Sequence, residues 1–409
     1  MTSNNKLKIF NDPIYGFITI PNALIFDLIE HRYFQRLRRI TQMGLSYLVY
    51  PGAHHTRFHH ALGCMFLMQK AIRILRFKGV LITKEEESGL LTAILLHDIG
   101  HGPFSHAMEH SLVNGVSHEE VSLLFMEQLN VEFNGRLSLA IKIFKGDYSR
   151  KFLNDLISSQ LDMDRADYLK RDSFYTGVAE GNINSERLIT MLNVVNDELV
   201  IEEKGIYSVE KFLTARRLMY WQVYLHKTSL VAEQLLIRLL MRAKELTSNG
   251  IHLEGCRNLN YFLQNNVSKS TLDFEALETF AKLDDVDIVS AMKTWRDHDD
   301  FVLSNLSQMI LERELLKIKF HKKKVKASNL QKHITRLKIK YNINDVEASY
   351  FVFNGEVMNQ AYELKKDNIK ILLKNGRVQD IVNISDHLNL KALSKLVTKY
   401  YICYPKDEL

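Results

Sequence analysis

The stretch LLTAILLHDIGHGPFSH, residues 90–106, decides how the rest of the sequence is interpreted. Its first seven residues are apolar or small on nearly every side of a helix, which predicts a helix buried in the centre of the protein. Thr83 followed by Glu86 is a capping box that predicts where this helix begins, and Gly100 and Gly102-Pro103 predict its stop. His97 and Asp98 therefore lie at a buried helix end, where an aspartate needs a cation or several hydrogen-bond donors.

Histidines are concentrated around this stretch. Nine of the 16 in the chain lie between His54 and His118. Burying several neutral imidazoles costs free energy unless they bind something, and a metal ion or a polyanion is the simplest explanation.

Two further residues would complete a set of nitrogen and oxygen ligands with His97 and Asp98. His60 lies early on a helix predicted over about residues 60–76, and Asp164 lies on a helix that Ser158 or Ser159 is expected to cap. A set without thiolate suits one divalent ion, Mn, Fe, Mg or Zn. The alternative is a surface or capping His-Asp pair, which is the more common role of such a pair by itself.

The distribution of proline predicts a mostly α fold. No proline falls between Pro103 and Pro405, and this stretch is rich in Leu, Lys, Glu and Ala. A long helix is expected over about residues 208–245. From about residue 328, segments rich in β-branched and aromatic residues predict the strands of a small C-terminal α+β lobe. These segments are ASYFVFN (348–354), NIKILLK (368–374), GRVQDIV (376–382) and KYYICYP (399–405).

The basic segment KIKFHKKKVK, residues 317–326, is expected to separate this lobe from the helical body. The predicted units are a core over residues 1–245, a helical extension over 246–327 and the lobe over 328–409.

Composition is that of an ordinary globular protein, with 46% apolar and 25% charged residues. The net charge of +6 permits contact with nucleic acid but suits small anions equally well. The three cysteines lie far apart, which argues against disulfides and suits a reducing compartment. No signal peptide and no apolar stretch long enough for a bilayer is present, so we expect a cytoplasmic protein with no membrane partner.

The pattern His60…His97-Asp98…Asp164 resembles the H…HD…D signature of HD-domain phosphohydrolases. The match is closest to the branch that hydrolyses deoxynucleoside triphosphates (dNTPs), which includes dGTPase-like enzymes and the animal enzyme that joins a sterile-alpha-motif to an HD domain. It runs from about Lys8 to Lys227 through NDPIYG (11–16), FQRLRRITQMG (34–44), PGAHHTRFHHALG (51–63), LLHDIGHGPFSH (95–106), LDMDRADYLKRD (161–172) and YLHK (224–227).

The resemblance implies an HD helical-bundle core and a reaction, hydrolysis of a dNTP to deoxynucleoside and triphosphate. His60, His97, Asp98 and Asp164 would hold one metal ion, which lowers the pKa of water, and a second Mg²⁺ accompanying the substrate is left open. His101, His106 and His118 would bind phosphate oxygens and protonate the departing 5′-oxygen, with His106 favoured as the acid and Glu119 orienting His118.

Substrate-binding residues also follow from the resemblance. Arg57 is suited to clamp phosphate, and Arg165 stands where the family often has Lys. Tyr168 and Asp172 share a helical face with Asp164. Positions that read the sugar and the outer phosphates are matched by Gln42, Arg216 and Tyr224. Plain core packing is the alternative for Tyr168 and Tyr224.

A regulatory nucleotide, GTP or a dNTP, is implied in the same way, with assembly into a homodimer or homotetramer. The residues that match this site are Lys8, Asn11, Glu30, Gln35, Arg38, His226 and Lys227. FQRLRRI is equally readable as an amphipathic helix that turns Phe34, Leu37 and Ile40 to the core and its arginines to water.

Two other functions are compatible with the sequence. HD sites also cleave nucleoside monophosphates, cyclic dinucleotides and alarmones, against which the basic set Arg57, Arg165, Arg216 and Lys227 favours a triphosphate. A module that binds nucleic acid through residues 317–326 without turnover is the second rival, and a solvated face or linker is the alternative for that segment.

Overall fold

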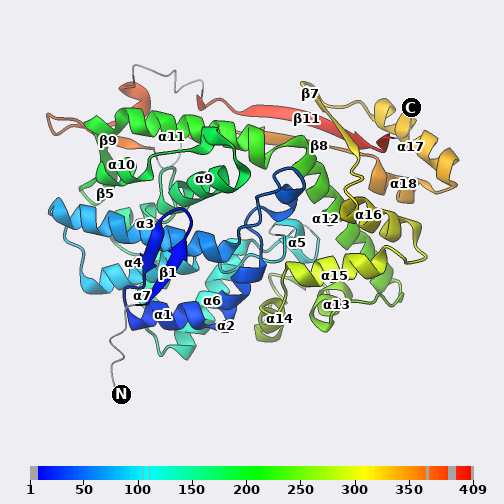
Figure 1. Cartoon of the computed structure of the whole chain (residues 1–409), viewed down its shortest axis with the longest axis horizontal. Coiled ribbons are helices and arrows are strands. Elements are labelled where there is room, and N and C mark those ends of the chain that lie inside the picture. The colour runs from blue at the N-terminus through cyan, green and yellow to red at the C-terminus, as the bar shows by residue number, and fades with distance from the viewer. Residues whose placement is uncertain (1–7, 105, 110, 365–367, 386–392, 407–409) are drawn as a thin grey trace.

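The computed structural model describes residues 8–104, 106–109, 111–364, 368–385 and 393–406, apart from the side chains of His106 and Asn114. The fold is mostly helical, as predicted, with four small sheets among the described residues. In the half of the molecule that contains the N-terminus, α3 (Arg57–Phe77) and α4 (Lys84–Leu96) pack on each other and, respectively, on α9 (Met163–Thr176) and α7 (Ser138–Lys145) (Figure 1). The other helices are α1 (Ala23–Glu30), α2 (Arg32–Gln35), α5 (His106–Glu109), α6 (His118–Glu132), α8 (Lys151–Asp155), α10 (Ser185–Thr190), α11 (Ile206–Met219), α12 (Lys227–Ser248), α13 (Arg257–Gln264), α14 (Phe274–Phe280), α15 (Asp285–Trp295), α16 (Phe301–Leu311), α17 (Ala327–Tyr341) and α18 (Asp345–Phe351).

The helix predicted from the capping box is confirmed. The Thr83 side chain accepts a hydrogen bond from the Glu86 backbone N–H at 3.1 Å, and the Glu86 carboxylate accepts one from the Thr83 N–H at 2.9 Å. Every residue from Gly89 to His101 is buried. This helix is therefore buried in the core of the body, and the His97-Asp98 dipeptide follows directly at its end.

Two other helix predictions needed correction. The helix that carries Asp164 is capped by Asp162, whose side chain accepts from the Arg165 N–H at 2.7 Å, and not by Ser158 or Ser159. The long helix expected over 208–245 is two helices, α11 and α12, separated by a π-helical turn over Tyr220–Tyr224 and by an extended backbone at His226. Turns of this kind often occur at functional sites, and Tyr224 lines the cavity described below.

The arginine-rich segment 34–40 was predicted to turn its apolar residues to the core and its arginines to water, and the structure confirms this only in part. Phe34, Leu37 and Ile40 are buried as expected, and Arg38 and Arg39 are exposed. Arg36, however, is buried, and its guanidinium donates to the carbonyls of Ile99 at 2.5 Å and His101 at 2.9 Å. Burial lowers the pKa of Arg36 to about 9, so the group stays charged at neutral pH and supports the turn after α4.

The C-terminal region contains strands, but they belong to two different sheets. β7 (Lys317–His321), β11 (Val397–Tyr404) and β8 (Phe353–Asn359) form an antiparallel sheet in the order β7-β11-β8. β9 (Lys370–Leu372) and β10 (Val378–Asp380) instead join β4 (Leu192–Val195) and β5 (Glu198–Glu202), and β9 pairs in parallel with β5. The basic segment is thus partly a paired strand rather than a linker, and residues 348–351 end a helix rather than begin a strand.

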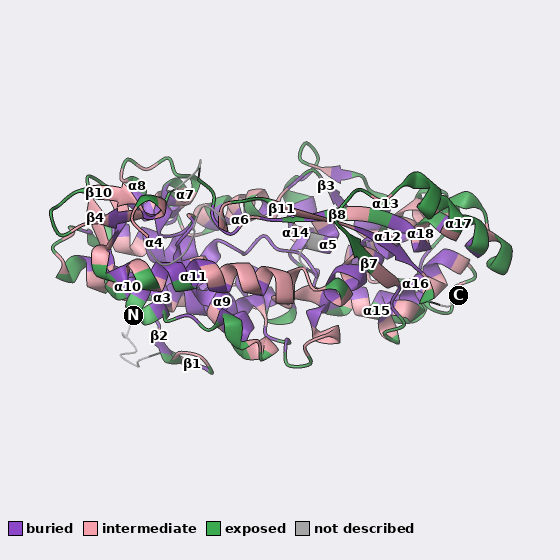
Figure 2. Ribbon diagram, turned by 90° about the horizontal axis from the view of Figure 1, so that it is seen from above, coloured by how far each residue is buried: buried purple, intermediate pink, exposed green. Residues whose placement is uncertain are grey.

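Two short pairs of strands complete the described structure. An N-terminal hairpin consists of β1 (Ile9–Asp12) and β2 (Gly16–Thr19), and β3 (Val113–Asn114) pairs in parallel with β6 (Val267–Ser268). Buried residues are concentrated on the central helices, whereas much of α17 is exposed (Figure 2). Among the helices described, none has the length and apolarity needed to cross a membrane.

Candidate active site

The four predicted metal ligands come together from three helices. His60 lies on the first turn of α3, His97 and Asp98 follow α4, and Asp164 lies on the first turn of α9. Asp164 Oδ1 is 3.1 Å from His60 Nε2 and 3.6 Å from His97 Nε2. Asp98 approaches His97 Nε2 at 3.5 Å and His60 Nε2 at 3.7 Å. Two atoms that each lie about 2.1 Å from a metal are about 3.0–3.6 Å apart at ordinary bond angles, so the spacing suits one cation.

The hydrogen bonds of the two imidazoles also fit a metal ion. His60 Nδ1 is 2.8 Å from Asp167 Oδ2, and His97 Nδ1 is 2.7 Å from the Ile94 carbonyl oxygen. Each Nδ1 therefore keeps its proton and leaves the Nε2 lone pair facing the carboxylates. His97 Nε2 is buried and has no hydrogen-bond partner among the described residues. A divalent cation bound to this set would satisfy that atom.

The electrostatic surroundings of Asp98 and Asp164 favour their ionised form, which is the form that binds a metal ion. Burial by itself raises the pKa of Asp164, but the adjacent imidazoles of His60 and His97 outweigh it and hold that pKa well below its usual range. The pKa of Asp98 is also held well below its usual range, because nearby His97, His101 and Arg57 outweigh its burial. Arg57 forms an ion pair with Asp98. Both acids are therefore ionised at neutral pH, as metal ligands must be.

Cys64 lies one helical turn beyond His60, with its Sγ 3.5 Å from His60 Nδ1. Its sulfur is close enough to His60, His97 and Asp164 to belong geometrically to the cluster. Burial raises the pKa of the Cys64 thiol far above its ordinary value, which disfavours the thiolate that a metal would require. The nitrogen and oxygen set therefore remains the better ligand group.

A cavity of about 520 Å³ opens on the candidate metal site. Asp98 and Asp164 line it, and so do four groups suited to phosphate, Arg57, His101, His118 and Arg165. Other predicted substrate residues on its wall are Gln42, Tyr168, Asp172 and Tyr224, and Glu119 also lines it. Arg216 is not among the lining residues. Several predicted substrate residues carry buried polar atoms that have no hydrogen-bond partner in the described part of the chain, namely Gln42 Oε1, Arg165 Nε, Tyr168 Oη, and Arg216 Nε and Nη1.

The candidate acid-base histidines have distinct surroundings. His101 and His118 stack with ring centroids 3.9 Å apart, and burial, with the charge of Arg57, holds the pKa of His101 well below its usual range. His118 Nδ1 is 2.8 Å from the Glu109 carboxylate, which also accepts from the His118 backbone N–H at 2.9 Å. The carboxylate that orients His118 is thus Glu109 rather than the neighbouring, exposed Glu119. The side chain of His106 lies outside the described part of the structure.

Asp172 is engaged by the protein itself. Its Oδ1 is 2.7 Å from His55 Nε2, and its Oδ2 accepts from the Tyr224 hydroxyl at 2.7 Å. Tyr224 in turn meets Tyr168 edge to face, with ring centroids 5.9 Å apart. Asp172 therefore orients Tyr224 on the cavity wall, in addition to any contact it makes with a ligand.

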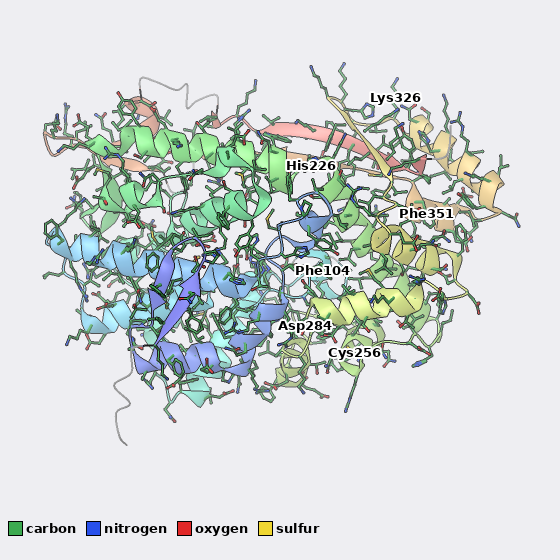
Figure 3. The ribbon with its side chains drawn as sticks, in the orientation of Figure 1. Phe104, His226, Cys256, Asp284, Lys326 and Phe351 are labelled. Atoms are coloured by element: carbon green, nitrogen blue, oxygen red, sulfur yellow. The ribbon has the colours of Figure 1, made fainter. Side chains whose placement is uncertain are left out.

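The start of α15 holds two further segments of the cavity wall in place. The Asp285 carboxylate accepts from the Phe104 N–H at 2.8 Å, the Thr41 N–H at 2.9 Å and the Thr41 hydroxyl at 2.7 Å. Phe104 and Asp284, labelled in Figure 3, mark where this loop meets α15. Thr41 immediately precedes Gln42, so the extension after residue 245 helps to shape the candidate site.

None of the seven predicted regulatory residues lines the cavity. Lys8, Asn11 and Glu30 are exposed, and the Lys8 ammonium lies 2.8 Å from the centroid of the Phe26 ring. Gln35 donates to the Ile29 carbonyl at 2.8 Å and accepts from Arg38 Nε at 2.9 Å. His226 caps α12, and Lys227 is exposed on its first turn. Lys8, Gln35, Arg38 and His226 thus make contacts within the chain, and a shared nucleotide site for the seven residues stays a proposal.

Sequence reasoning missed four residues that orient functional groups, namely Asp167, His55, Glu109 and Arg36. His55 and Glu109 lie within the histidine-rich region, and Asp167 lies one turn after Asp164, so their positions offered some signal. Arg36 offered none, because an arginine on an amphipathic helix is normally solvated.

With this geometry in place, comparison with known proteins identifies the class. The model of the HD domain matches residues 57–172, and that of the HD associated region matches residues 183–259. The chain belongs to the HD-domain phosphohydrolase family.

Relatives of known sequence or structure extend the match. A phosphohydrolase from Bacteroides thetaiotaomicron is similar in structure, with a TM-score of 0.95 and 51% identity over 98% of this chain and 100% of that one. The uncharacterized protein YwfO of Bacillus subtilis is 32% identical over 99% of this chain and 94% of its own length. The deoxynucleoside triphosphate triphosphohydrolase SAMHD1 homolog of Dictyostelium discoideum is 31% identical over 55% of this chain and 47% of its own length. The chain thus spans about half of that enzyme.

Proposed function

We propose that the protein hydrolyses deoxynucleoside triphosphates to deoxynucleoside and inorganic triphosphate. The observation that carries this proposal is the cavity in which two carboxylates of the metal set, Asp98 and Asp164, lie beside Arg57, Arg165, His101 and His118. Tyr168 and Tyr224 supply an aromatic wall of the kind that a deoxyribose can pack against. The similarity to named dNTP triphosphohydrolases supports the same substrate class.

The proposed ligands of the metal are His60, His97, Asp98 and Asp164. When bound, a divalent cation, Mn, Fe, Mg or Zn, would polarise the α-phosphate and make water more acidic. In this proposal Arg57 and Arg165 bind phosphate oxygens. Water attacks the α-phosphorus, the bond to the 5′-oxygen breaks, and a histidine protonates that oxygen. His118, oriented by Glu109, joins His106 as a candidate for this acid.

Regulation and assembly are part of the proposal. Lys8, Asn11, Glu30, Gln35, Arg38, His226 and Lys227 would bind GTP or a dNTP between subunits of a homodimer or homotetramer. We propose a cytoplasmic location. The rival substrates are nucleoside monophosphates, cyclic dinucleotides and alarmones. Two arginines on the cavity wall, Arg57 and Arg165, beside one candidate metal site favour a triphosphate over a monophosphate, because more phosphate charge must be neutralised.

Product identity tests the proposal. Each dNTP is incubated with Mn²⁺ or Mg²⁺ in water enriched in oxygen-18, with and without added GTP, and Asp164→Ala serves as the inactive control. We expect deoxynucleoside and triphosphate, with the heavy oxygen in the triphosphate, because water attacks phosphorus and not carbon. Stepwise release of single phosphates, or turnover of cyclic dinucleotides alone, would show that the substrate is wrong. Stimulation by GTP that Arg38→Ala abolishes is expected if the regulatory site exists.

A further inference from the structure

A chain of buried ionic hydrogen bonds connects the candidate ligand His60 to the N-terminal hairpin. Asp167 Oδ2 is 2.8 Å from His60 Nδ1. Arg171 binds both oxygens of Asp167, through Nε at 2.8 Å and a terminal nitrogen at 3.0 Å. The other terminal nitrogen of Arg171 donates to Asp12 Oδ2 at 2.8 Å. We refer to Asp167, Arg171 and Asp12 as the relay.

The relay is shielded from water along its length. The side chains of Arg171 and Asp167 are 0% exposed, and that of Asp12 is 4% exposed. The two carboxylates raise the pKa of Arg171, although burial opposes them, and Arg171 in turn helps to bring the pKa of Asp167 to about 2. Charged hydrogen bonds in such surroundings are strong and directional, so each group restricts the orientation of the next.

Gly63 provides an independent sign that α3 accommodates this relay. A Cβ at Gly63 would lie 2.0 Å from Asp167 Oδ1 and 2.3 Å from a terminal nitrogen of Arg171. Glycine is otherwise unfavourable inside a helix, and Gly63 lies three residues after His60 in α3. The position of Asp167 and Arg171 therefore leaves no room for a side chain at residue 63 of α3.

The far end of the relay belongs to a surface element. Asp12 is the last residue of β1, and its other oxygen accepts from the backbone N–H groups of Ile14 and Tyr15 at 2.9 and 3.0 Å. The same carboxylate thus fixes the turn of the hairpin and the relay. Figure 1 shows this hairpin, in dark blue, lying against α3.

We propose that Asp12, Arg171 and Asp167 are positioning residues for His60, through which the N-terminal hairpin sets the affinity of the metal site. This inference rests on the metal centre of the proposed function and not on the identity of the substrate. The hydrogen bond from His60 Nδ1 to Asp167 keeps Nε2 free to bind a cation and sets the direction in which the ring points. Loosening the hairpin end of the relay should therefore weaken cation binding although no ligand has changed.

Mn²⁺ affinity, measured by competition with a chelator, tests the proposal. Asp167→Asn should weaken binding about 10- to 100-fold, the usual effect of losing such a partner. Asp12→Asn keeps the oxygen that accepts from the turn, but it places an amide NH₂ group opposite Arg171 in place of the oxygen Oδ2. This change should weaken Mn²⁺ binding roughly 3- to 10-fold. Arg171→Lys should behave like Asp12→Asn. The matched control is Arg242→Lys, because Arg242 binds both oxygens of Asp300 in the same manner, at 3.1 and 2.6 Å, outside the cavity.

Folding is checked by thermal unfolding and circular dichroism of each variant in excess chelator. Gly63→Ala offers a second route to the relay that changes no charged group, and it should also weaken Mn²⁺ binding. Parental affinity in both Asp12→Asn and Asp167→Asn would show that the relay serves packing alone and would overturn the proposal. A loss confined to Asp167→Asn would overturn the role of the hairpin. A parent protein that binds Mn²⁺ but hydrolyses no dNTP would contradict the proposed substrate and leave the positioning result intact.

Discussion

At the scale of single residues, the candidate site depends on which nitrogen of each imidazole keeps its proton. Ile94 and Asp167 hold the Nδ1 protons of His97 and His60, and both Nε2 atoms therefore face Asp98 and Asp164. The same logic applies to the candidate acid, since Glu109 binds His118 Nδ1 and thereby fixes the orientation of its ring.

Glu109→Gln and Glu119→Gln form a matched pair for this assignment. The two carboxylates flank His118, but only Glu109 is bonded to its ring in the described structure. We expect Glu109→Gln to lower kcat by about 10-fold or more with a smaller change in KM, because it removes the carboxylate that orients the His118 ring. Glu119→Gln should change kcat less than about 2-fold. Steady-state kinetics with the preferred dNTP provide the measurement, and equal effects of the two changes would contradict the assignment.

At the scale of elements, the site is built where helices end or break. Asp164 follows the N-terminus of α9, His97 and Asp98 follow the C-terminus of α4, and Tyr224 closes the π-helical turn before α12. The helical extension contributes through Asp285 on the first turn of α15, which binds the loops that carry Thr41 and Phe104. Burial raises the pKa of Asp285 to about 6 although these hydrogen bonds oppose the rise.

A pH dependence of stability follows from Asp285. Its pKa is higher in the folded protein than in the unfolded chain, so the folded state binds the proton more tightly. The resulting stabilisation is complete below about pH 4 and is lost as the pH rises to about 6. Between pH 5 and pH 7 the free energy of unfolding of the parent should therefore fall by about 1 kcal/mol relative to that of Asp285→Asn.

Urea unfolding of the two proteins at both pH values provides this measurement. Comparing differences between parent and variant removes the contributions of other acids, including Asp98 and Asp164, whose low pKa values act at more acidic pH. A parent-to-variant difference that is the same at pH 5 and pH 7 would show that Asp285 titrates normally.

At the scale of the whole molecule, two of the strands predicted to belong to a C-terminal lobe pair with strands of the helical body. β9 and β10 extend a sheet that begins with β4 and β5 in the region between α10 and α11, and Ile371 faces Ile201 across the parallel pair. Lys399 of β11 lies over the ring of Trp221 in the π-helical turn, 3.7 Å from its centroid. We therefore expect the body and the C-terminal strands to unfold together.

Ile371→Ala tests this cooperativity. Ile371 is 0% exposed, and its truncation should lower the free energy of unfolding by about 3 kcal/mol. Ile339→Ala, at a position 79% exposed on α17, is the control and should cost about 0.5 kcal/mol or less. Denaturation followed by circular dichroism and by the fluorescence of Trp221 and Trp295 should give one coincident transition. A separate early transition that leaves the signal of Trp295 unchanged would support an independent lobe instead.

The sequence by itself determined the central helix and predicted the residues of the candidate metal cluster. A capping box, an apolar run and helix-stopping glycines are local signals, and they located α4 and its His97-Asp98 end without any knowledge of the fold. The resemblance of short motifs then added His60 and Asp164. Local signals were weaker at Asp162, which caps α9 in place of a serine, and at His226, where one expected helix becomes two.

Only the tertiary structure decided which side chains support this cluster. The partners of His60, His118 and Asp172 are Asp167, Glu109 and His55, and the choice depends on how helices distant in sequence pack against each other. The burial of Arg36 and the parallel pairing of β5 with β9 have the same origin. Contacts between distant segments are fixed by the packing of a common core, and neither periodicity nor capping in any single segment records them.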